Sequence, residues 1–341
     1  MIFNYPKISQ NLIIDLPPRV RDIVERRFGL KNGQRETLEA IGQDYGITRE
    51  RVRQIEENGF SKIKPRLAKM ENIFQYFIKE IKENGDLKKE DILLPYLGRK
   101  RFNVHIYFLL TLGERFERFN EDEDLYSLWT IDKSSLDKEE KVIDGLVEKL
   151  AEVNRPMLFD EIVDDFGEEI KEETKIILNP KIILSYIEVT KKIEQGPHGL
   201  YGLTEWPEIT PRGIKDRAYL VFKKVNKPLH FSQVAEWINN LGYNPESRQA
   251  LPQTVHNELI KDPRFVLVGR GMYALKEWGY EPGLVKDIIA KILQENKKPI
   301  TRDEIVEQVS QQRLVKKNTI ILNLSDKKYF VKTEEGKYTL K

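Results

Sequence analysis

The sequence feature that most constrains the fold is a pair of markers that recurs through the last two-thirds of the chain. Four successive segments close on an aromatic phrase, whose tyrosines are Tyr126, Tyr201, Tyr273 and Tyr338, at intervals of 75, 72 and 65 residues. A second marker precedes three of them, in Asn154-Arg155-Pro156, Asn226-Lys227-Pro228 and Lys297-Lys298-Pro299, with 45, 45 and 39 residues from proline to tyrosine. In the first segment Asn84-Gly85-Asp86 takes the marker's place, with 40 residues from Asp86 to Tyr126. Two markers that keep their order and approximate separation indicate tandem copies of one small module.

Each copy contains three helix-like stretches and a closing hairpin. Apolar residues at helical spacing open a copy, as in Val142, Leu146 and Leu150. A second helix follows the proline marker, and its clearest start is the capping-box pattern of residues 301–304. A third helical stretch and two short apolar strands about a turn complete the copy, as in residues 252–275. This content predicts a winged helix, and an unrelated α+β domain with a tail hairpin is the alternative.

The sequence therefore predicts a mainly α fold with small β wings, in five domains. A helix-turn-helix domain would occupy residues 1–70. Four winged-helix-like modules would follow over 71–133, 137–207, 212–280 and 281–341.

The third module resembles a known domain type. Its residues Ala218-Tyr219-Leu220-Val221, Pro228-Leu229-His230-Phe231 and Phe265 through Gly279 are similar to the HARE-type winged helix, which is also found at the start of the delta subunit of bacterial RNA polymerase. The resemblance covers residues 214–279, and the other three modules share only the marker phrases.

Charge is distributed unevenly along the chain. Residues 1–70 carry 14 Lys and Arg against 9 Asp and Glu, residues 71–213 carry 20 against 31, and residues 214–341 carry 23 against 15. Basic ends around an acidic middle predict that the ends bind a polyanion, although a charged surface can also be merely solvated. The chain has no cysteine, which excludes disulfides and thiolate zinc sites.

The chain is expected to be cytoplasmic and, in a bacterium, associated with the nucleoid. No apolar run is long enough to span a bilayer. The first residues also lack the basic-then-apolar layout of a signal peptide.

Residues 16–67 contain the signals of a helix-turn-helix. A first helix is expected to begin at Pro17-Pro18 and to end at Gly29. Thr37 is a candidate cap for a short second helix, which Gly46 would end in the left-handed conformation. Thr48 would then cap a third helix.

The outer face of this third helix has the chemistry of a groove reader. Val52, Ile55, Gly59, Phe60 and Ile63 share one side, so Glu50, Arg53, Gln54 and Glu57 point the opposite way, with Arg49 and Arg51 beside them. Arginine can bond guanine, glutamine can pair with adenine, and glutamate can accept from cytosine. The alternative is a surface helix stabilised by pairs of opposite charge, which this spacing also permits.

The same segment resembles region four of primary bacterial sigma factors. The resemblance rests on Leu16-Pro17-Pro18-Arg19, Glu25 through Leu30, Leu38 through Gly42, and Tyr45 through Glu56. It implies that this helix-turn-helix reads the minus-thirty-five promoter element and docks on the flap of the RNA polymerase β subunit. By position it assigns base contacts to Arg49, Glu50 and Gln54. It assigns backbone contacts to Leu38, Glu39, Thr48, Arg51 and Arg53.

Two departures from that family bear on function. Family members usually continue the third helix with alanine and basic residues, whereas this chain has Glu57-Asn58-Gly59-Phe60. A glycine inside a helix costs about 0.5–1 kcal/mol relative to alanine, and Glu57 repels phosphates. Only fifteen residues precede Leu16, so a counterpart of the sigma region that melts promoters is not expected. We therefore expect that the chain does not open promoters alone.

The basic C-terminal half offers further candidate DNA contacts. They lie on third helices and a wing, and are Gln253, Thr254, Asn257, Lys261, Arg264, Arg270, Lys316 and Lys317. A solvated surface without a ligand is the alternative for this set. The acidic modules would be repelled by phosphates and suit a protein partner or a spacer role.

Nothing in the sequence indicates an enzyme, a cofactor, a metal or a small-molecule substrate. The four histidines lack metal-ligand spacing, and neither a phosphate-binding loop nor a dinucleotide fingerprint is present. The sequence predicts a sequence-specific DNA-binding factor that acts in transcription initiation, with double-stranded promoter DNA and, by resemblance, RNA polymerase core as partners. The alternatives are a delta-like polymerase subunit that acts mainly through protein contacts, and an architectural DNA-binding protein.

Overall fold

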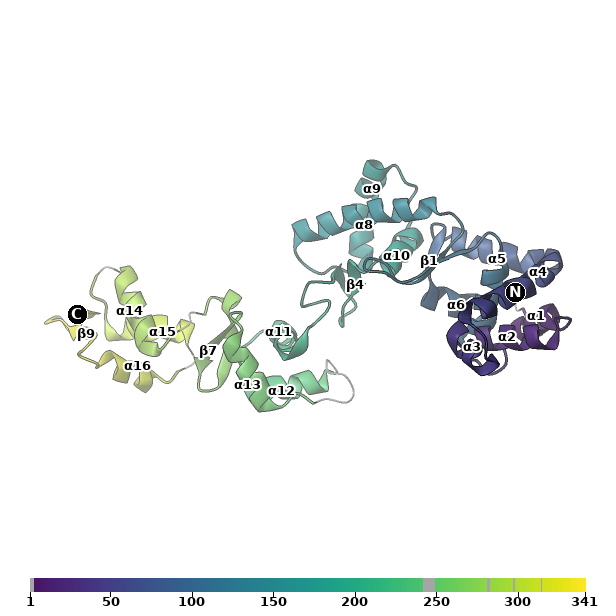
Figure 1. The fold of residues 1–341 in the computed structure, drawn as a ribbon. Helices are drawn as coiled ribbons and strands as arrows, with labels where there is room; N and C mark the ends of the chain where they lie inside the picture. The colour runs from purple at the N-terminus through teal and green to yellow at the C-terminus, as the bar shows by residue number, and fades with distance from the viewer. Residues whose placement is uncertain (1–2, 242–248, 281–282, 297, 314) are drawn as a thin grey trace. The chain divides into compact units, whose positions relative to one another are not determined.

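The computed structural model describes residues 3–241, 249–280, 283–296, 298–313 and 315–341. These residues are mainly helical and carry four small antiparallel sheets, which confirms the predicted fold class (Figure 1). The chain divides into two compact units, Met1–Thr204 and Glu205–Lys341. No helix among the described residues is long and apolar enough to cross a bilayer.

The first unit begins with four helices. They are α1 (Tyr5–Ile13), α2 (Pro18–Phe28), α3 (Leu38–Tyr45) and α4 (Arg49–Leu67). The last three form the predicted helix-turn-helix with the predicted ends. The Thr37 hydroxyl accepts a hydrogen bond from the Ala40 amide at 3.1 Å, and the Thr48 hydroxyl accepts one from the Arg51 amide at 3.2 Å. Gly46 ends α3 in the left-handed conformation, with φ at 63°.

Gly42 permits the close approach of α3 and α4. A Cβ placed there would lie 2.7 Å from the backbone oxygen of Ile47, an atom that cannot turn away as a side chain could. We expect Gly42→Ala to lower the free energy of unfolding by about 1–3 kcal/mol, the usual cost of an overpacked core, in a denaturant titration.

A second glycine provides the matched control. Gly145 lies inside α8 (Ser134–Val153), and a Cβ there would meet only Ile170, at 3.6 Å or more. Gly145→Ala should therefore raise the free energy of unfolding by about 0.5–1 kcal/mol through helix propensity. Equal effects of the two substitutions would contradict this account of Gly42.

The remaining elements form four modules with one topology. The first has α5 (Glu71–Lys82), β1 (Leu87–Lys89), α6 (Glu90–Gly98), α7 (Asn103–Leu112), β2 (Glu117–Phe119) and β3 (Leu128–Thr130). The second has α8, α9 (Phe159–Thr174), α10 (Pro180–Val189), β4 (Ile193–Gln195) and β5 (Tyr201–Leu203). The third has α11 (Gly213–Val225), β6 (Leu229–His230), α12 (Phe231–Asn240), α13 (Pro252–Lys261), β7 (Phe265–Gly269) and β8 (Met272–Leu275). The fourth has α14 (Val285–Asn296), α15 (Arg302–Gln312), α16 (Lys317–Leu324), β9 (Phe330–Lys332) and β10 (Tyr338–Leu340).

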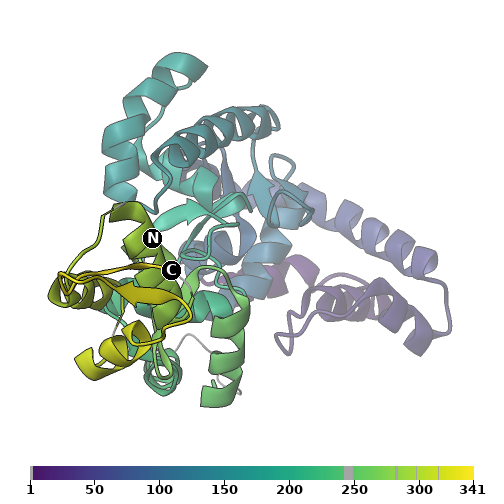
Figure 2. The ribbon, with the colours of Figure 1, turned by 90° about the vertical axis from the view of Figure 1, so that its left-hand side faces the viewer.

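In every module a short extended segment before the second helix pairs with the last strand of the hairpin. The pairs are Lys88 with Trp129, Met157 with Tyr201, Leu229 with Tyr273, and Ile300 with Tyr338. Each module therefore contains the three helices, the extra strand and the terminal hairpin that the winged-helix prediction requires. Figure 2 shows the hairpin of the fourth module in yellow, beside the helices of that module. Lys297, part of the proline marker of the fourth module, lies outside the described residues.

The strand pairing corrects the alignment of the first repeat. The residue equivalent to Tyr201, Tyr273 and Tyr338 is Trp129, three positions after Tyr126. Like those tyrosines, Trp129 pairs with the residue that lies two positions before the second helix of its module. Asn84 is likewise not the counterpart of Asn154, which takes the left-handed conformation at the end of α8 with φ at 50°.

The counterpart of Asn154 in the first module is Gly85, whose φ is 84°. The polar marker therefore records a backbone requirement for a positive φ, which asparagine and glycine both satisfy.

Tyr126 instead joins the first two winged helices. Its hydroxyl donates a hydrogen bond to the Glu194 carboxylate of β4, and its amide donates to the Val189 carbonyl at 2.9 Å. Helix α10 also docks on the first module, since the Ser185 hydroxyl donates to the Leu87 carbonyl at 2.9 Å. Hydrogen bonds therefore connect the two modules directly.

The helix-turn-helix and the first winged helix share one hydrophobic core. The cluster includes Leu12 and Phe28 from the N-terminal helices, Phe108 from α7 and Trp129 from β3. Helix α1, which the sequence reasoning did not find, covers α7, and the Tyr5 hydroxyl donates to the Leu97 carbonyl at 2.8 Å. In the second unit, separate clusters form the cores of the third and fourth winged helices.

Candidate nucleic-acid interface

The inner face of α4 fixes which of its residues can meet a ligand. Val52 and Ile63 have no exposed surface, and Val52 packs with Ile23 and Ile41 of the two preceding helices. Gly59 is also buried, and a Cβ there would lie 2.9 Å from Cγ1 of Val20. The glycine that departs from the sigma pattern is therefore the point where α2 packs closely against α4.

The outer face gathers the predicted base-contacting residues. Arg49, Glu50 and Gln54 are all exposed, on the first two turns of α4. Arg51 and Arg53, predicted to contact backbone, are exposed on the same turns. The structure thus places these five side chains on one exposed stretch of helix, as the periodicity predicts.

Two hydrogen-bonded groups connect these side chains. Arg53 donates from Nε and Nη2 to Glu50, at 2.9 and 2.7 Å, and from Nη1 to Glu57. Arg51 donates from Nη1 to Oε1 of Gln54 at 3.1 Å. The hydrogen bonds from Arg53 lower the pKa of Glu50, so this carboxyl is an acceptor at neutral pH. The charge pairs expected for a merely solvated helix are present too, and they occupy groups that a duplex would also bind.

The remaining predicted backbone contacts lie at helix starts. Thr48 is exposed and caps α4 with its hydroxyl. Glu39 is exposed in the first turn of α3, whereas Leu38 is half-buried against the small core of the helix-turn-helix. Backbone N–H groups at a helix start can donate hydrogen bonds to a phosphate, which suits the starts of both α3 and α4.

Arg26 orients α3, although the sequence reasoning did not single it out. It donates to the Glu36 carboxylate at 3.0 and 2.6 Å and to Asp44 near the end of α3. These hydrogen bonds lower the pKa of Glu36. The partners lie 10 and 18 residues from Arg26, so no helical spacing reveals them.

A second polar contact joins the same two helices. The Tyr45 hydroxyl donates to Asp22 at 2.7 Å, and the Arg19 guanidinium lies 5.1 Å from the centre of the Tyr45 ring. Together with Arg26, this contact holds α3 against α2.

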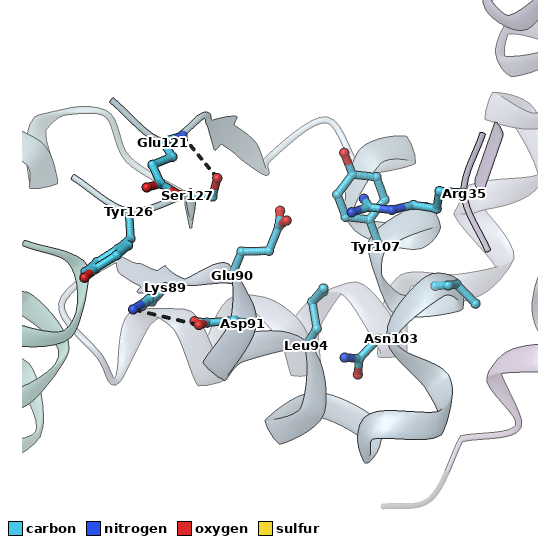
Figure 3. Close-up of a pocket in the computed structure, with 11 residues that line it drawn as sticks. Arg35, Lys89, Glu90, Asp91, Leu94, Asn103, Tyr107, Glu121, Tyr126 and Ser127 are labelled. Carbon is cyan, nitrogen blue, oxygen red and sulfur yellow. Dashed lines mark hydrogen bonds and ion pairs between the residues drawn. The ribbon is translucent and has the colours of Figure 1, made fainter. Parts of the chain in front are cut away.

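A cavity of about 360 Å³ lies where the helix-turn-helix meets the first winged helix. The Arg35 guanidinium lies 4.1 Å from the centre of the Tyr107 ring, and Figure 3 shows the two side chains against each other. On another wall, Glu90 accepts hydrogen bonds from Arg118 at 3.0 Å and from Trp129 at 2.9 Å. The cavity between the two domains is thus lined by charged side chains and by aromatic and aliphatic ones.

The third helices of the winged helices differ in exposure between the two units. In the first unit, α7 buries Ile106, Phe108, Leu109, Leu110 and Leu112, and α10 docks on the first module. In the second unit, α13 buries only Val255 and Leu259, and α16 only Ile320 and Leu324. The outer faces of α13 and α16 are therefore open within their own modules.

The predicted secondary contacts fall mostly on these open faces. Their exposed members are Gln253, Thr254, Asn257 and Lys261 on α13, Arg270 at the wing turn, and Lys316 and Lys317 at the start of α16. Lys317 pairs with Asp303 at 3.2 Å. Arg264 is different, because it is half-buried and bonds Asp216 at 2.7 Å and Asp262 at 2.6 Å. Its place beside the wing is explained by this packing.

No cluster of histidine or carboxylate side chains in the described ranges is arranged to hold a metal ion.

Comparison with known proteins identifies the helix-turn-helix. The family model for sigma-70, region 4 matches residues 12–64, so this segment is a sigma-70 region 4 domain. RNA polymerase sigma factor SigA of Microcystis aeruginosa is 46% identical over 55 residues, which are 16% of this chain and 13% of SigA.

Two further relatives match a similar share of the chain. RNA polymerase sigma factor SigA of a Nostoc species is 44% identical over 66 residues, with 17% of each protein covered. RNA polymerase principal sigma factor HrdD of Streptomyces coelicolor is 41% identical over 54 residues, with 16% of each covered. The chain therefore spans less than a fifth of the length of these relatives.

Proposed function

We propose that the chain is a sequence-specific DNA-binding factor of transcription initiation, whose region 4 domain reads a minus-thirty-five-like promoter element. The observation that carries this proposal is the exposure of Arg49, Glu50 and Gln54 together on the first turns of α4. These are the side chains whose donors and acceptors match base edges in the major groove. The test is whether the full chain prefers a duplex with such a hexamer over a scrambled duplex of equal composition.

The assigned roles follow from the position of each group. Arg49 and Gln54 would donate to base edges, and Glu50 would accept from cytosine. Arg51 and Arg53 would bind phosphates with their side chains and set the register of the helix. Leu38, Glu39 and Thr48 at the helix starts would contact the DNA backbone through their amide N–H groups. RNA polymerase core is proposed as a partner because the relatives of this domain are RNA polymerase sigma factors.

The open third helices of the second unit support a second, sequence-independent grip on DNA. Arg270 and Lys316 are exposed on a wing and at the start of α16, in a segment with 23 basic and 15 acidic residues. The third helices of the first unit are instead engaged by neighbouring modules. Phosphate binding by lysine and arginine releases counterions, so this grip should be strongly dependent on salt.

Substitution of these two residues tests the second grip. We expect Arg270→Ala with Lys316→Ala to weaken binding of hexamer and scrambled duplexes equally. The slope of log affinity against log salt should fall by about one per residue removed. The control is Lys141→Ala, which removes an exposed lysine from α8 and should change the affinity for neither duplex. Loss of hexamer preference in the double variant would contradict a sequence-independent role.

A further inference from the structure

The Arg53 side chain is held between two carboxylates on the recognition helix. Its Nε and Nη2 bond Glu50, three residues earlier, and its Nη1 bonds Glu57, four residues later. About half of each side chain is exposed: 46% for Arg53, 59% for Glu50 and 58% for Glu57. All three nitrogens of the guanidinium therefore have carboxylate partners before any DNA arrives.

The two carboxylates differ in what else they can reach. Glu50 lies in the first turn of α4, where the proposed function assigns it a contact with a base edge. Glu57 lies seven residues further on, about 10 Å along the helix axis. Its carboxylate bonds the arginine that would bind phosphate, and its own charge opposes the approach of a phosphate to that arginine.

We propose that Glu57 restrains Arg53 and so sets the affinity of the recognition helix for the DNA backbone. The inference rests on the proposed function, because it assumes that the exposed face of α4 binds a duplex. Arg53 must leave Glu57 to contact a phosphate, so each binding event breaks this pair. The chain then binds any duplex more weakly than its count of exposed arginines implies, while base discrimination by Arg49 and Gln54 is unchanged.

Glu57→Gln tests the proposal because it keeps the size of the side chain and removes its charge. We expect this variant to bind hexamer and scrambled duplexes more tightly by about threefold to tenfold at 0.1 M salt, given that exposed ion pairs are weak. The salt slope should stay the same, because Arg53 neutralises the same phosphate in the unaltered chain and in the variant. The ratio of the two affinities should not change.

A double-substitution cycle separates restraint from simple repulsion. With Arg53→Ala in place, Glu57→Gln should improve affinity by less than about twofold, since no arginine remains to be released. An equal gain with and without Arg53 would overturn the proposal, because Glu57 would then act by repulsion alone. Glu172→Gln is the matched control, since it removes an exposed glutamate from α9 and should leave affinity unchanged.

The outcomes also separate this inference from the function on which it rests. Hexamer-preferring binding by the full chain that Glu57→Gln leaves unchanged would overturn the restraint alone. No duplex binding by either the unaltered chain or the variant would overturn both. Binding that becomes measurable only in Glu57→Gln would support both.

Discussion

Arg49→Ala and Gln54→Ala are each expected to abolish most of the preference of the chain for a minus-thirty-five-like hexamer. Each removes a side chain that would bond a base edge, and such a contact is worth about 1–3 kcal/mol of discrimination. The expected result is a fall of about tenfold to hundredfold in affinity for the hexamer duplex. Affinity for a scrambled duplex should change much less. Equilibrium titration of the full chain with both labelled duplexes measures the ratio.

Arg51→Ala and Arg53→Ala provide the comparison for these two variants. Both side chains are exposed on the same turns of α4, so the four substitutions disturb the fold to a similar extent. Because each substitution removes a contact to the DNA backbone, it should lower the affinity for both duplexes alike and reduce the salt slope by about one. If all four variants weakened every duplex equally, the division into base and backbone contacts would be wrong.

Phe28→Ala is expected to cause the largest loss of stability among the substitutions considered. Phe28 is 3% exposed, and its ring centroid lies 5.1 Å from that of Phe108 and 5.7 Å from that of Phe60. Removal of a buried phenylalanine typically costs about 3–5 kcal/mol. Because Phe28 belongs to α2 and Phe108 to α7, the cavity would open between the region 4 domain and the first winged helix. Chemical denaturation measures the effect by tryptophan fluorescence in a background where Trp206, Trp237 and Trp278 are replaced by Phe, which leaves Trp129, in the same cluster, as the reporter.

Ile14→Ala is the control for Phe28→Ala. Ile14 follows α1 and is 51% exposed, so its truncation should change the free energy of unfolding by less than about 0.5 kcal/mol. A loss below about 1 kcal/mol in Phe28→Ala would mean that the two domains do not share a core.

The region 4 domain could be predicted closely because its signals are local. Thr37 and Thr48 cap their helices as expected, and Gly46 adopts the left-handed conformation that its position indicates. Each signal acts within one turn of chain, so no knowledge of the rest of the fold is needed. The direction of Arg49, Glu50 and Gln54 follows from helical periodicity in the same way.

The three helices and the hairpin of each module could be predicted from the sequence, but the docking of the modules could not. The aromatic phrase predicts the wrong equivalence in the first module, because Trp129 replaces the tyrosine and Tyr126, three residues earlier, matches the phrase by residue type alone. The burial of α7 left a signal that could have been used. The helix's own apolar residues lie on all of its sides, which is typical of a buried helix rather than of one with a free outer face.

Other features of the interface depend on contacts distant in sequence. Arg26 meets Glu36 and Asp44 across the loop between α2 and α3, and no periodic pattern predicts such a contact. Gly59 was correctly identified as unusual inside a helix. Its reason, the closeness of Val20, is visible only once α2 is packed against α4.

The most direct test of the proposed function is the affinity of the full chain for two labelled duplexes across a salt series. One duplex carries a minus-thirty-five-like hexamer and the other a scrambled hexamer of the same composition. Base readout adds contacts that release no counterions, so the account predicts tighter binding of the hexamer with a shallower salt dependence. Equal and steeply salt-dependent binding of both duplexes would contradict sequence-specific recognition, and binding to neither would contradict a DNA-reading role for α4.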